Sequence, residues 1–301
     1  MENTIKNNKI NDYSKENRNA IIKLVIVRII SYSFLILLSA FCIFFFYLLL
    51  INTTKSNNQL QAGKISLIPS TSFFTNLKNL FTSFRGEFNA LSGFFNSLVI
   101  AGFSSILTCY FSALTAYGIF AYNFKGKKIM ETFILAIMMI PTQLSSVGFF
   151  QLACKMNLKN ELWVLIIPTI ASPACFFYMI QYLRATLPKD LIEASRIDGS
   201  NEFMTFNRIV IPIMKPAIAV QFIFSFVASW NNLYMPSLLL TDPNKKTLPV
   251  MINALQHTSW GSLDLGCVYM AIFLSILPVV IVYLILSKFI IKGVTAGSVK
   301  G

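Results

Sequence analysis

Charged residues are scarce in this chain. Only 12% of its 301 residues are Asp, Glu, Lys or Arg, whereas about a quarter is usual in soluble domains. Each of six stretches has at least 22 residues without any of these or histidine, and about 20 helical residues cross the hydrocarbon core of a bilayer. These stretches are 29–51, 93–122, 132–154, 162–183, 217–241 and 265–287. The scarcity of charge excludes an ordinary soluble domain and predicts an all-α fold, a polytopic membrane helical bundle with six transmembrane helices.

Side chains for catalysis and metal binding are equally few. His257 is the only histidine, and the five cysteines are scattered through the apolar runs without a close pair. This set offers little raw material for a metal cluster or a catalytic triad. The chain also lacks a phosphate loop of the form GxxxxGK(S/T). We therefore predict no catalytic residue, no metal site and no bound cofactor, and a protein that is not an enzyme.

Basic residues are unevenly distributed between the apolar stretches. Of the 25 Lys and Arg residues, 17 lie in the segment up to Arg28, in 123–128, in 184–215 and in the tail from Lys288. Positive charge collects on the cytoplasmic side of membrane proteins, so both termini and 184–215 are expected inside. The net charge of +13 is explained by this topology and by attraction to membrane lipid; nucleic acid is not an expected partner.

These patterns divide the chain into five segments. Polar residues 1–28 are expected to form a disordered, basic cytoplasmic arm, followed by a first transmembrane helix at 29–51. Segment 52–92 is predicted to be an external loop, in which "FFTNLKNLFTSF" has the spacing of a short amphipathic helix at the membrane interface or against a partner. Residues 93–291 form the transmembrane core, and 292–301 a cytoplasmic tail.

One polar segment interrupts the core. After Pro188, which suits a first helical turn, good helix formers place Leu191, Ala194 and Ile197 on one face. Gly199 can end this helix in a left-handed conformation, and Ser200 or Asn201 can cap a second one. The sequence predicts a helix-Gly-helix elbow over 188–212, which either rests on lipid headgroups or docks a partner.

The elbow resembles the EAA motif of ABC-importer permeases. Its residues are Glu193, Ala194 and Ser195, then Asp198 and Gly199, then nine residues before Ile209, Ile211 and Pro212. Ser195 and Ile211 stand where the motif has Ala and Leu. Further segments, among them "FFNSLVIAG", "MMIPTQ", "WNNLYMPSLLL" and the tail "KGVTAGSVKG", follow the order typical of maltose-type (MalG-like) carbohydrate permeases, from about residue 70 to the end.

The resemblance implies a type I importer subunit in a bacterial cell membrane that works by alternating access. It implies four kinds of partner: a second permease subunit in a heterodimer, two ATPase subunits that hold ATP and Mg, an extracytoplasmic solute-binding protein and membrane lipid. The elbow would be the coupling helix, with Glu193 facing a basic residue of the ATPase and Gly199 at the bend. The tail would also touch the ATPase, through Gly293, Thr295, Gly297 and Lys300.

The substrate expectation rests on what the apolar stretches contain. Ion-coupled carriers keep ionisable groups inside their helices, whereas these stretches contain none and offer amides and an aromatic face, which suit a neutral sugar. Gln143, Trp230, Asn231 and Asn232 are the candidate pathway residues. Each amide could equally form an interhelical hydrogen bond. A non-sugar polar solute, or a self-contained secondary transporter with internal repeats, is the alternative.

Overall fold

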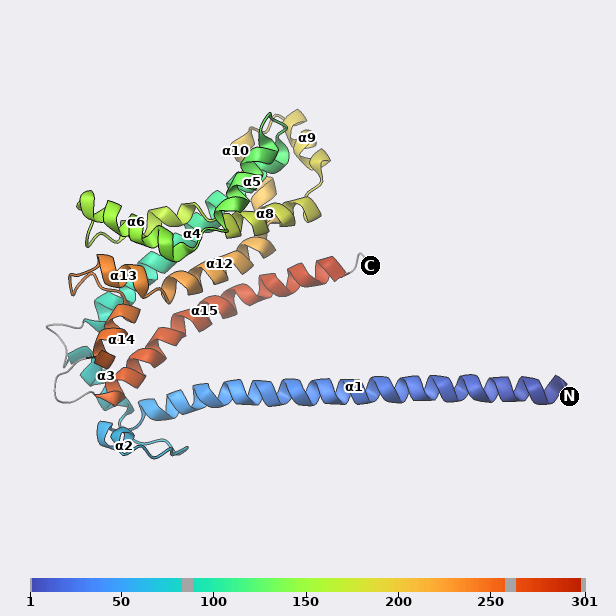
Figure 1. The fold of residues 1–301 in the computed structure, drawn as a ribbon, viewed down its shortest axis with the longest axis horizontal. Coiled ribbons are helices and arrows are strands. Elements are labelled where there is room, and N and C mark those ends of the chain that lie inside the picture. Colours follow the sequence, from blue (N-terminus) through green and yellow to red (C-terminus); the bar gives the residue numbers. More distant parts are fainter. Residues whose placement is uncertain (1, 83–88, 258–263, 299–301) are drawn as a thin grey trace.

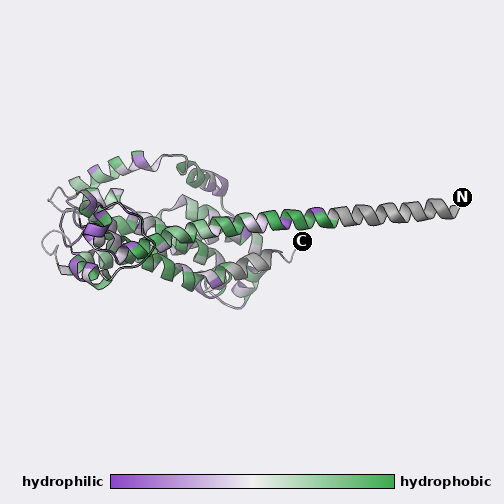
Figure 2. Cartoon of the chain, turned by 90° about the horizontal axis from the view of Figure 1, so that it is seen from below, coloured by the Kyte–Doolittle hydropathy of each residue, from purple (hydrophilic) through white to green (hydrophobic). Residues whose placement is uncertain are grey.

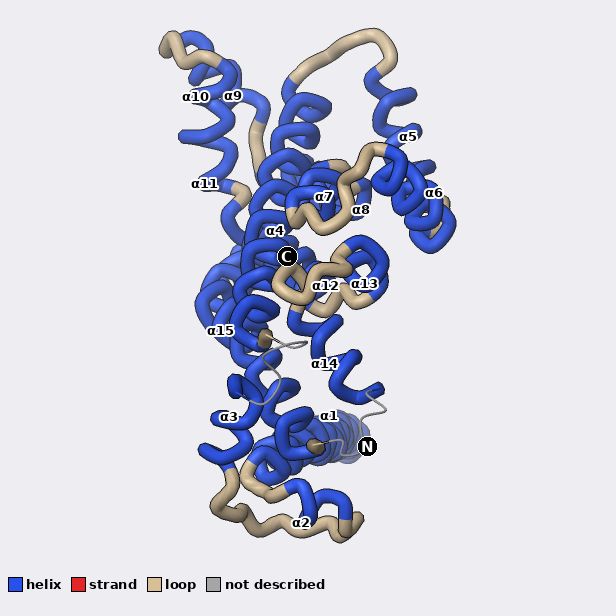
Figure 3. Tube along the Cα trace, turned by 90° about the vertical axis from the view of Figure 1, so that its left-hand side faces the viewer, coloured by secondary structure: helices blue, strands red, loops and turns tan. Residues whose placement is uncertain are grey.

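The computed structural model describes residues 2–82, 89–257 and 264–298, with side chains described for 21–82, 89–256 and 264–290. Within these ranges the secondary structure is helical and no strand occurs (Figure 3). The predicted all-α class is confirmed.

Long apolar helices dominate the described residues. Four of them are long and apolar enough to cross a membrane: Ile21–Thr53, Ala90–Ala121, Trp163–Thr186 and Leu265–Ile290. Two further pairs of helices have the necessary length and composition together, but they are bent by 90° and 81°. Up to six spans result if each bent pair is one crossing. The count of six and the side of the termini stay predictions.

Helix α4 (Ala90–Ala121) is the centre of the bundle (Figure 1). Along it pack α12 (Lys215–Trp230), α8 (Pro173–Thr186), the short α7 (Trp163–Ile166) and the 3-10 turn η1 (Ile167–Ile170). Small α4 residues such as Ala101, Ser105 and Ala113 are fully buried. Small side chains let helix backbones approach closely where there is no water to drive association, so α4 can hold several neighbours at once.

Helix α1 (Glu2–Thr53) extends away from the bundle (Figures 1 and 2). Side chains 21–47 are all exposed, and the helix touches α15 (Leu265–Ser298). The predicted disordered arm over 1–28 is wrong, because the helix begins at Glu2. Residues 1–53 contain no glycine or proline. A helix nucleated in the apolar run can therefore extend outward with one backbone hydrogen bond for each residue added.

The short amphipathic helix expected in 52–92 is α3 (Phe73–Thr82), which follows α2 (Asn57–Gln61). It packs on α15 of its own chain, with Leu80 buried. Asn76, only 3% exposed, donates through Nδ2 to the carbonyl oxygens of Thr53 and Lys55, both at 2.8 Å. This segment therefore fixes the end of α1 to the start of α15.

Two predicted spans are interrupted rather than continuous. The 132–154 stretch is divided into α5 (Lys127–Ile137) and α6 (Thr142–Lys155), which meet at the 90° bend. Pro141 stands directly before α6, where its missing N–H costs nothing. The 217–241 stretch breaks after Trp230 and continues as α13 (Tyr234–Leu239), with α14 (Leu248–His257) beyond it. Both breaks lie beside the cleft described below.

Candidate functional site

The elbow begins with α9 (Lys189–Ile197), which stops as the sequence predicted. Gly199 has a φ of +77°, a conformation that costs an L-residue with a side chain about 1–2 kcal/mol. Its N–H donates to the Arg196 carbonyl at 3.1 Å, and the Ser200 N–H donates to the Ser195 carbonyl at 3.0 Å. These two bonds form a Schellman ending, so the bend has one defined geometry.

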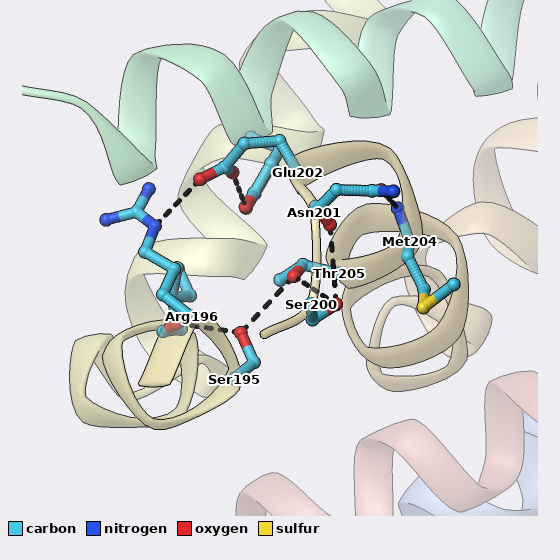
Figure 4. Close-up of polar contacts among 9 residues, drawn as sticks. Ser195, Arg196, Ser200, Asn201, Glu202, Met204 and Thr205 are labelled. Atoms are coloured by element: carbon cyan, nitrogen blue, oxygen red, sulfur yellow. Dashed lines mark hydrogen bonds and ion pairs between the residues drawn. The ribbon is translucent and has the colours of Figure 1, made fainter. Parts of the chain in front are cut away.

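The second helix starts at α10 (Glu202–Thr205), and Asn201 is its cap. The Asn201 side-chain oxygen accepts from the Met204 N–H at 2.8 Å (Figure 4). A π-helical turn, η2 (Phe206–Val210), and α11 (Ile211–Ile213) then lead into α12. Because Pro212 has no N–H and its ring crowds the carbonyl four residues earlier, a widened turn is accommodated directly before it.

A chain of hydroxyl groups joins the two arms of the elbow. The Ser195 Oγ donates to the Ile192 carbonyl at 2.7 Å and lies 3.3 Å from the Thr205 Oγ1. Thr205, which is fully buried, donates in turn to the Ser200 Oγ at 2.9 Å (Figure 4). A buried hydroxyl without a partner would be costly. Ser195, the residue that departs from the motif alanine, is thus part of the structure of the bend.

Glu202 anchors the elbow to α4. Its Oε1 accepts from the Arg196 Nε at 2.7 Å, which joins the two arms (Figure 4). Its Oε2 accepts from the Tyr117 hydroxyl at 2.6 Å, and Tyr117 belongs to α4. Arg196 also lies over the Tyr122 ring, 5.2 Å from its centroid. The hydrogen bond to Glu202 raises the pKa of Arg196, so this cation stays charged.

The elbow has a buried face and an exposed one. Ile192 and Phe206 belong to the cluster of buried side chains that includes parts of α4 and α8. The predicted apolar face of α9 points the other way, with Ile197 87% exposed and Phe203 of α10 71% exposed. Glu193 lies on the exposed surface, and no hydrogen-bond or ion-pair partner is found for it among the described side chains. The elbow thus presents an apolar and acidic surface outward.

The structure describes only part of the predicted tail. Gly293, Thr295 and Gly297 lie in the last turns of α15, but their side chains are outside the described residues, as is Lys300 altogether.

A cleft of about 600 Å³ lies where α4, α12, η1 and the start of α8 face the bend between α5 and α6. Of the four predicted pathway residues, Asn232 lines it, whereas Gln143 and Asn231 are exposed outside it. Its polar groups are mostly hydroxyls rather than the expected amides. They come from Ser104, Thr108, Thr142, Ser145, Thr169, Ser172, Ser225 and Ser229.

Trp230 occupies a core position away from this cleft. It is 1% exposed, stacks on Phe226 with ring centroids 5.7 Å apart, and meets Phe94 edge-on at 5.8 Å. Its Nε1 donates to the Ser275 carbonyl of α15 at 2.9 Å. The ring therefore ties α12 to α4 and α15, and the structure does not bring it to the other candidate pathway residues.

The residues that form the elbow and most of the cleft lie in a segment that matches a known family. Residues 110–295 match the family described as the binding-protein-dependent transport system inner membrane component. The chain belongs to this family. It is a multi-pass permease subunit of a membrane transport system rather than an enzyme, and both the elbow and most of the cleft lie inside the matched region.

Two named relatives of this permease are permease proteins of carbohydrate transport systems. The arabinooligosaccharides transport system permease protein AraQ of Bacillus subtilis is 36% identical over 202 residues, covering 66% of this chain and 70% of that protein. The lactose transport system permease protein LacG of Rhizobium radiobacter is 30% identical over 272 residues, covering 90% of this chain and 96% of that protein. The resemblance noted in the sequence is confirmed.

A solved structure shares the fold of this permease. A chain of a bacterial ABC transporter involved in the import of the acidic polysaccharide alginate matches with a TM-score of 0.73. It is 20% identical, and the match covers 87% of this chain and 96% of that one. At this identity the match establishes the helical architecture alone.

Sequence reasoning missed two features of the site. Tyr117 carried no signal, because its partner Glu202 is 85 positions away. The hydroxyls of the cleft were overlooked although Ile100, Ser104 and Thr108 recur every four residues, which puts them on one helical face. That periodicity was the available signal.

Proposed function

We propose that this permease forms half of the translocation pathway of an ATP-driven importer of carbohydrates. AraQ and LacG are named for the transport of arabinooligosaccharides and of lactose, which supports this class of solute. The cleft agrees with it, because every described residue lining the space is uncharged. A neutral solute does not require a charged counterpart, whose burial would be expensive in the membrane.

The elbow is the element that receives the mechanical force produced by ATP hydrolysis in the partner subunit. The single observation that carries this proposal is its combination of internal rigidity with an outward surface that has no partner among the described side chains. Two backbone bonds at Gly199, the Ser195–Thr205–Ser200 hydroxyls and the Glu202 anchor fix its shape. Ile197 and Phe203 then remain exposed as apolar contacts. A packed two-helix unit of this kind transmits a push that a flexible loop would absorb.

The partner on this surface is a cytoplasmic ATPase subunit. No phosphate loop occurs in the sequence, so ATP and Mg belong to that subunit, of which a complete assembly holds two. Glu193 is the acid that a basic ATPase residue would meet. The tail around Gly293 and Gly297 continues the helix that packs along α12, from where it can reach the same subunit.

Two more partners complete the assembly. A second permease subunit supplies the other half of the pathway, facing the open side of the cleft. An extracytoplasmic solute-binding protein delivers the sugar, which is in keeping with the binding-protein dependence in the family's description.

The test changes the exposed elbow surface without touching its interior. In cells whose own copy is deleted, Ile197→Asp is compared with Ile68→Asp, a matched change at a residue 75% exposed between α2 and α3. Burying an unpaired carboxylate in an apolar contact is costly. We expect Ile197→Asp to reduce both sugar uptake and ATPase copurification by more than about ten-fold, the effect of 1.4 kcal/mol.

Membrane content of both variants is measured by immunoblot. Ile68→Asp should keep uptake and ATPase copurification near the native level. The proposal is abandoned if Ile197→Asp and Glu193→Ala both retain native uptake and native copurification.

A further inference from the structure

The hydroxyl-lined cleft is built from two facing helical stripes. On α4, Ser104 and Thr108 are four residues apart, and on α12, Ser225 and Ser229 are four apart. Asn232 lies in the turn that follows α12. Residues spaced by three or four share one face of a helix. Since α4 and α12 pack against each other, these stripes place uncharged polar groups on adjoining walls.

Several hydroxyl groups of the cleft form hydrogen bonds within the protein. Thr108 donates to the Thr169 carbonyl at 2.8 Å, and Thr169 donates to the Ile166 carbonyl at 2.6 Å. The Ser172 Oγ accepts from the Cys175 N–H at 3.4 Å as the cap of α8. These bonds account for one donor or acceptor of each group.

Ser104 combines deep burial with an unpaired hydroxyl, as Ser112 and Thr247 do outside the cleft. Its side chain is 2% exposed, and its Oγ finds no hydrogen-bond partner in the described part of the chain. An unpartnered hydroxyl at such depth costs free energy, and Ser104 is one of the residues that line the cleft. The Ser104 Oγ is closed to solvent in this conformation, so a ligand in the cleft would pair with it after a small shift of the surrounding side chains.

We propose that this cleft binds one sugar unit of the transported carbohydrate, with Ser104 as the buried hydrogen-bonding group. The inference rests on the proposed function and adds where the sugar sits in this subunit. A hydroxyl or an amide side chain both donates and accepts hydrogen bonds, so Ser104, Ser229 and Asn232 can each pair with a hydroxyl group of a sugar ring. The volume falls within the range of about 300–1,000 Å³ of small-molecule sites.

The chemistry of the lining also selects against charge. No Lys, Arg, His, Asp or Glu is among the described residues around the cleft, so an ionised ligand would lose its water without gaining a counter-ion. The cleft should therefore discriminate neutral sugars from their uronic acid counterparts.

The experiment uses the complete assembly, purified with its partner subunits and reconstituted in liposomes with and without enclosed ATP. Uptake of arabinotriose, lactose, maltose and raffinose is measured, with galacturonate as the charged probe. The variants are Ser104→Ala, Ser104→Leu and the control Ser112→Ala, a change at another buried serine of α4 outside the cleft.

We expect Ser104→Ala to raise the KM of the transported sugar roughly three- to ten-fold, the loss of one hydrogen bond, with the maximal rate within about two-fold. Thermal stability should not fall, because the variant removes a hydroxyl that lacks a protein partner. Ser104→Leu should fill the cleft and abolish uptake while the assembly still copurifies. Ser112→Ala should keep the native KM.

Different results separate the two proposals. ATP-dependent uptake with the native KM in Ser104→Ala, or an equal KM shift in Ser112→Ala, overturns the cleft assignment and leaves the importer intact. Failure to take up any of the four sugars with ATP overturns the proposed function, and the cleft assignment with it. Uptake of galacturonate in preference to the neutral sugars overturns the claim of selectivity.

Discussion

The hydrogen bond between Tyr117 and Glu202 offers a direct test of how the elbow is held. Tyr117→Phe removes only the phenolic hydroxyl, which donates to Glu202 at 2.6 Å. A hydrogen bond to a charged group contributes about 1.5–3 kcal/mol. The Glu202 side chain is 41% exposed, so water compensates part of this loss. We expect about 1–2 kcal/mol, which is a factor of roughly 5–30 in a local opening equilibrium.

Amide hydrogen exchange of the permease in lipid nanodiscs measures this opening. Amides of α10 should exchange roughly 5–30-fold faster in Tyr117→Phe. The matched control is Tyr110→Phe on the same helix, whose hydroxyl lies 3.4 Å from the neutral Asn207 Oδ1. That longer bond to an uncharged acceptor should change exchange by less than about three-fold.

The functional readout is sugar imported per ATP hydrolysed. If α4 is moved through Glu202, the ratio should fall in Tyr117→Phe while the assembly stays intact. Exchange of α10 within two-fold of the native rate, or equal acceleration by Tyr110→Phe, would refute the anchor.

Four further substitutions have calculable outcomes. In Gly199→Ala the new Cβ meets no atom within 4 Å, but the residue keeps a φ of +77°, so the elbow should be destabilised by about 1–2 kcal/mol. Gly118→Ala on α4 is also uncrowded and should be neutral or stabilising by about 0.5–1 kcal/mol. Hydrogen exchange distinguishes the two variants. Gly266→Ala would place a Cβ 2.6 Å from the Asn76 Oδ1, displacing a buried amide with two bonds, and should cost about 2–3 kcal/mol in thermal unfolding. Trp230→Phe loses one hydrogen bond and some packing, which should lower the stability by about 1–2 kcal/mol. The KM for sugar should stay unchanged, because the ring lies outside the cleft. An increased KM would place Trp230 in the substrate pathway.

Local chemistry explains which parts of the elbow could be predicted. Gly199 and Asn201 act through backbone groups only a few residues away, so their positions are readable in the sequence. Glu202 was readable as a favourable acid at a helix start, but not as the partner of Tyr117. A contact over 85 positions depends on how α4 and the elbow pack, which no local pattern encodes.

Composition also led to wrong expectations about three features of the structure. Asn and Lys in residues 1–20 indicated disorder, yet no helix breaker separates them from the apolar run of α1. Trp230 at membrane depth has the same sequence signature whether it stacks on a sugar or on Phe226. The cleft depends on the breaks after Ile137 and Trp230. Pro141, directly before α6, is a local signal for the first break, whereas residues 231–233 at the second contain no proline.

The two helices held by the elbow are also walls of the cleft. On α4, Tyr117 and Ser104 are 13 residues apart, about 20 Å along a helix; α12 follows the elbow directly and carries Ser229. Because both walls are tied to one rigid unit, a push on the elbow displaces them together instead of separating them. Two further walls follow this unit, because η1 is hydrogen-bonded to α4 through Thr108 and Thr169 and α8 leads directly into α9. The wall formed by α6 lacks such a tie and adjoins the 90° bend. We therefore expect the cleft to open and close by movement of the α4–α12 pair against α6, the direction in which bound sugar would be released.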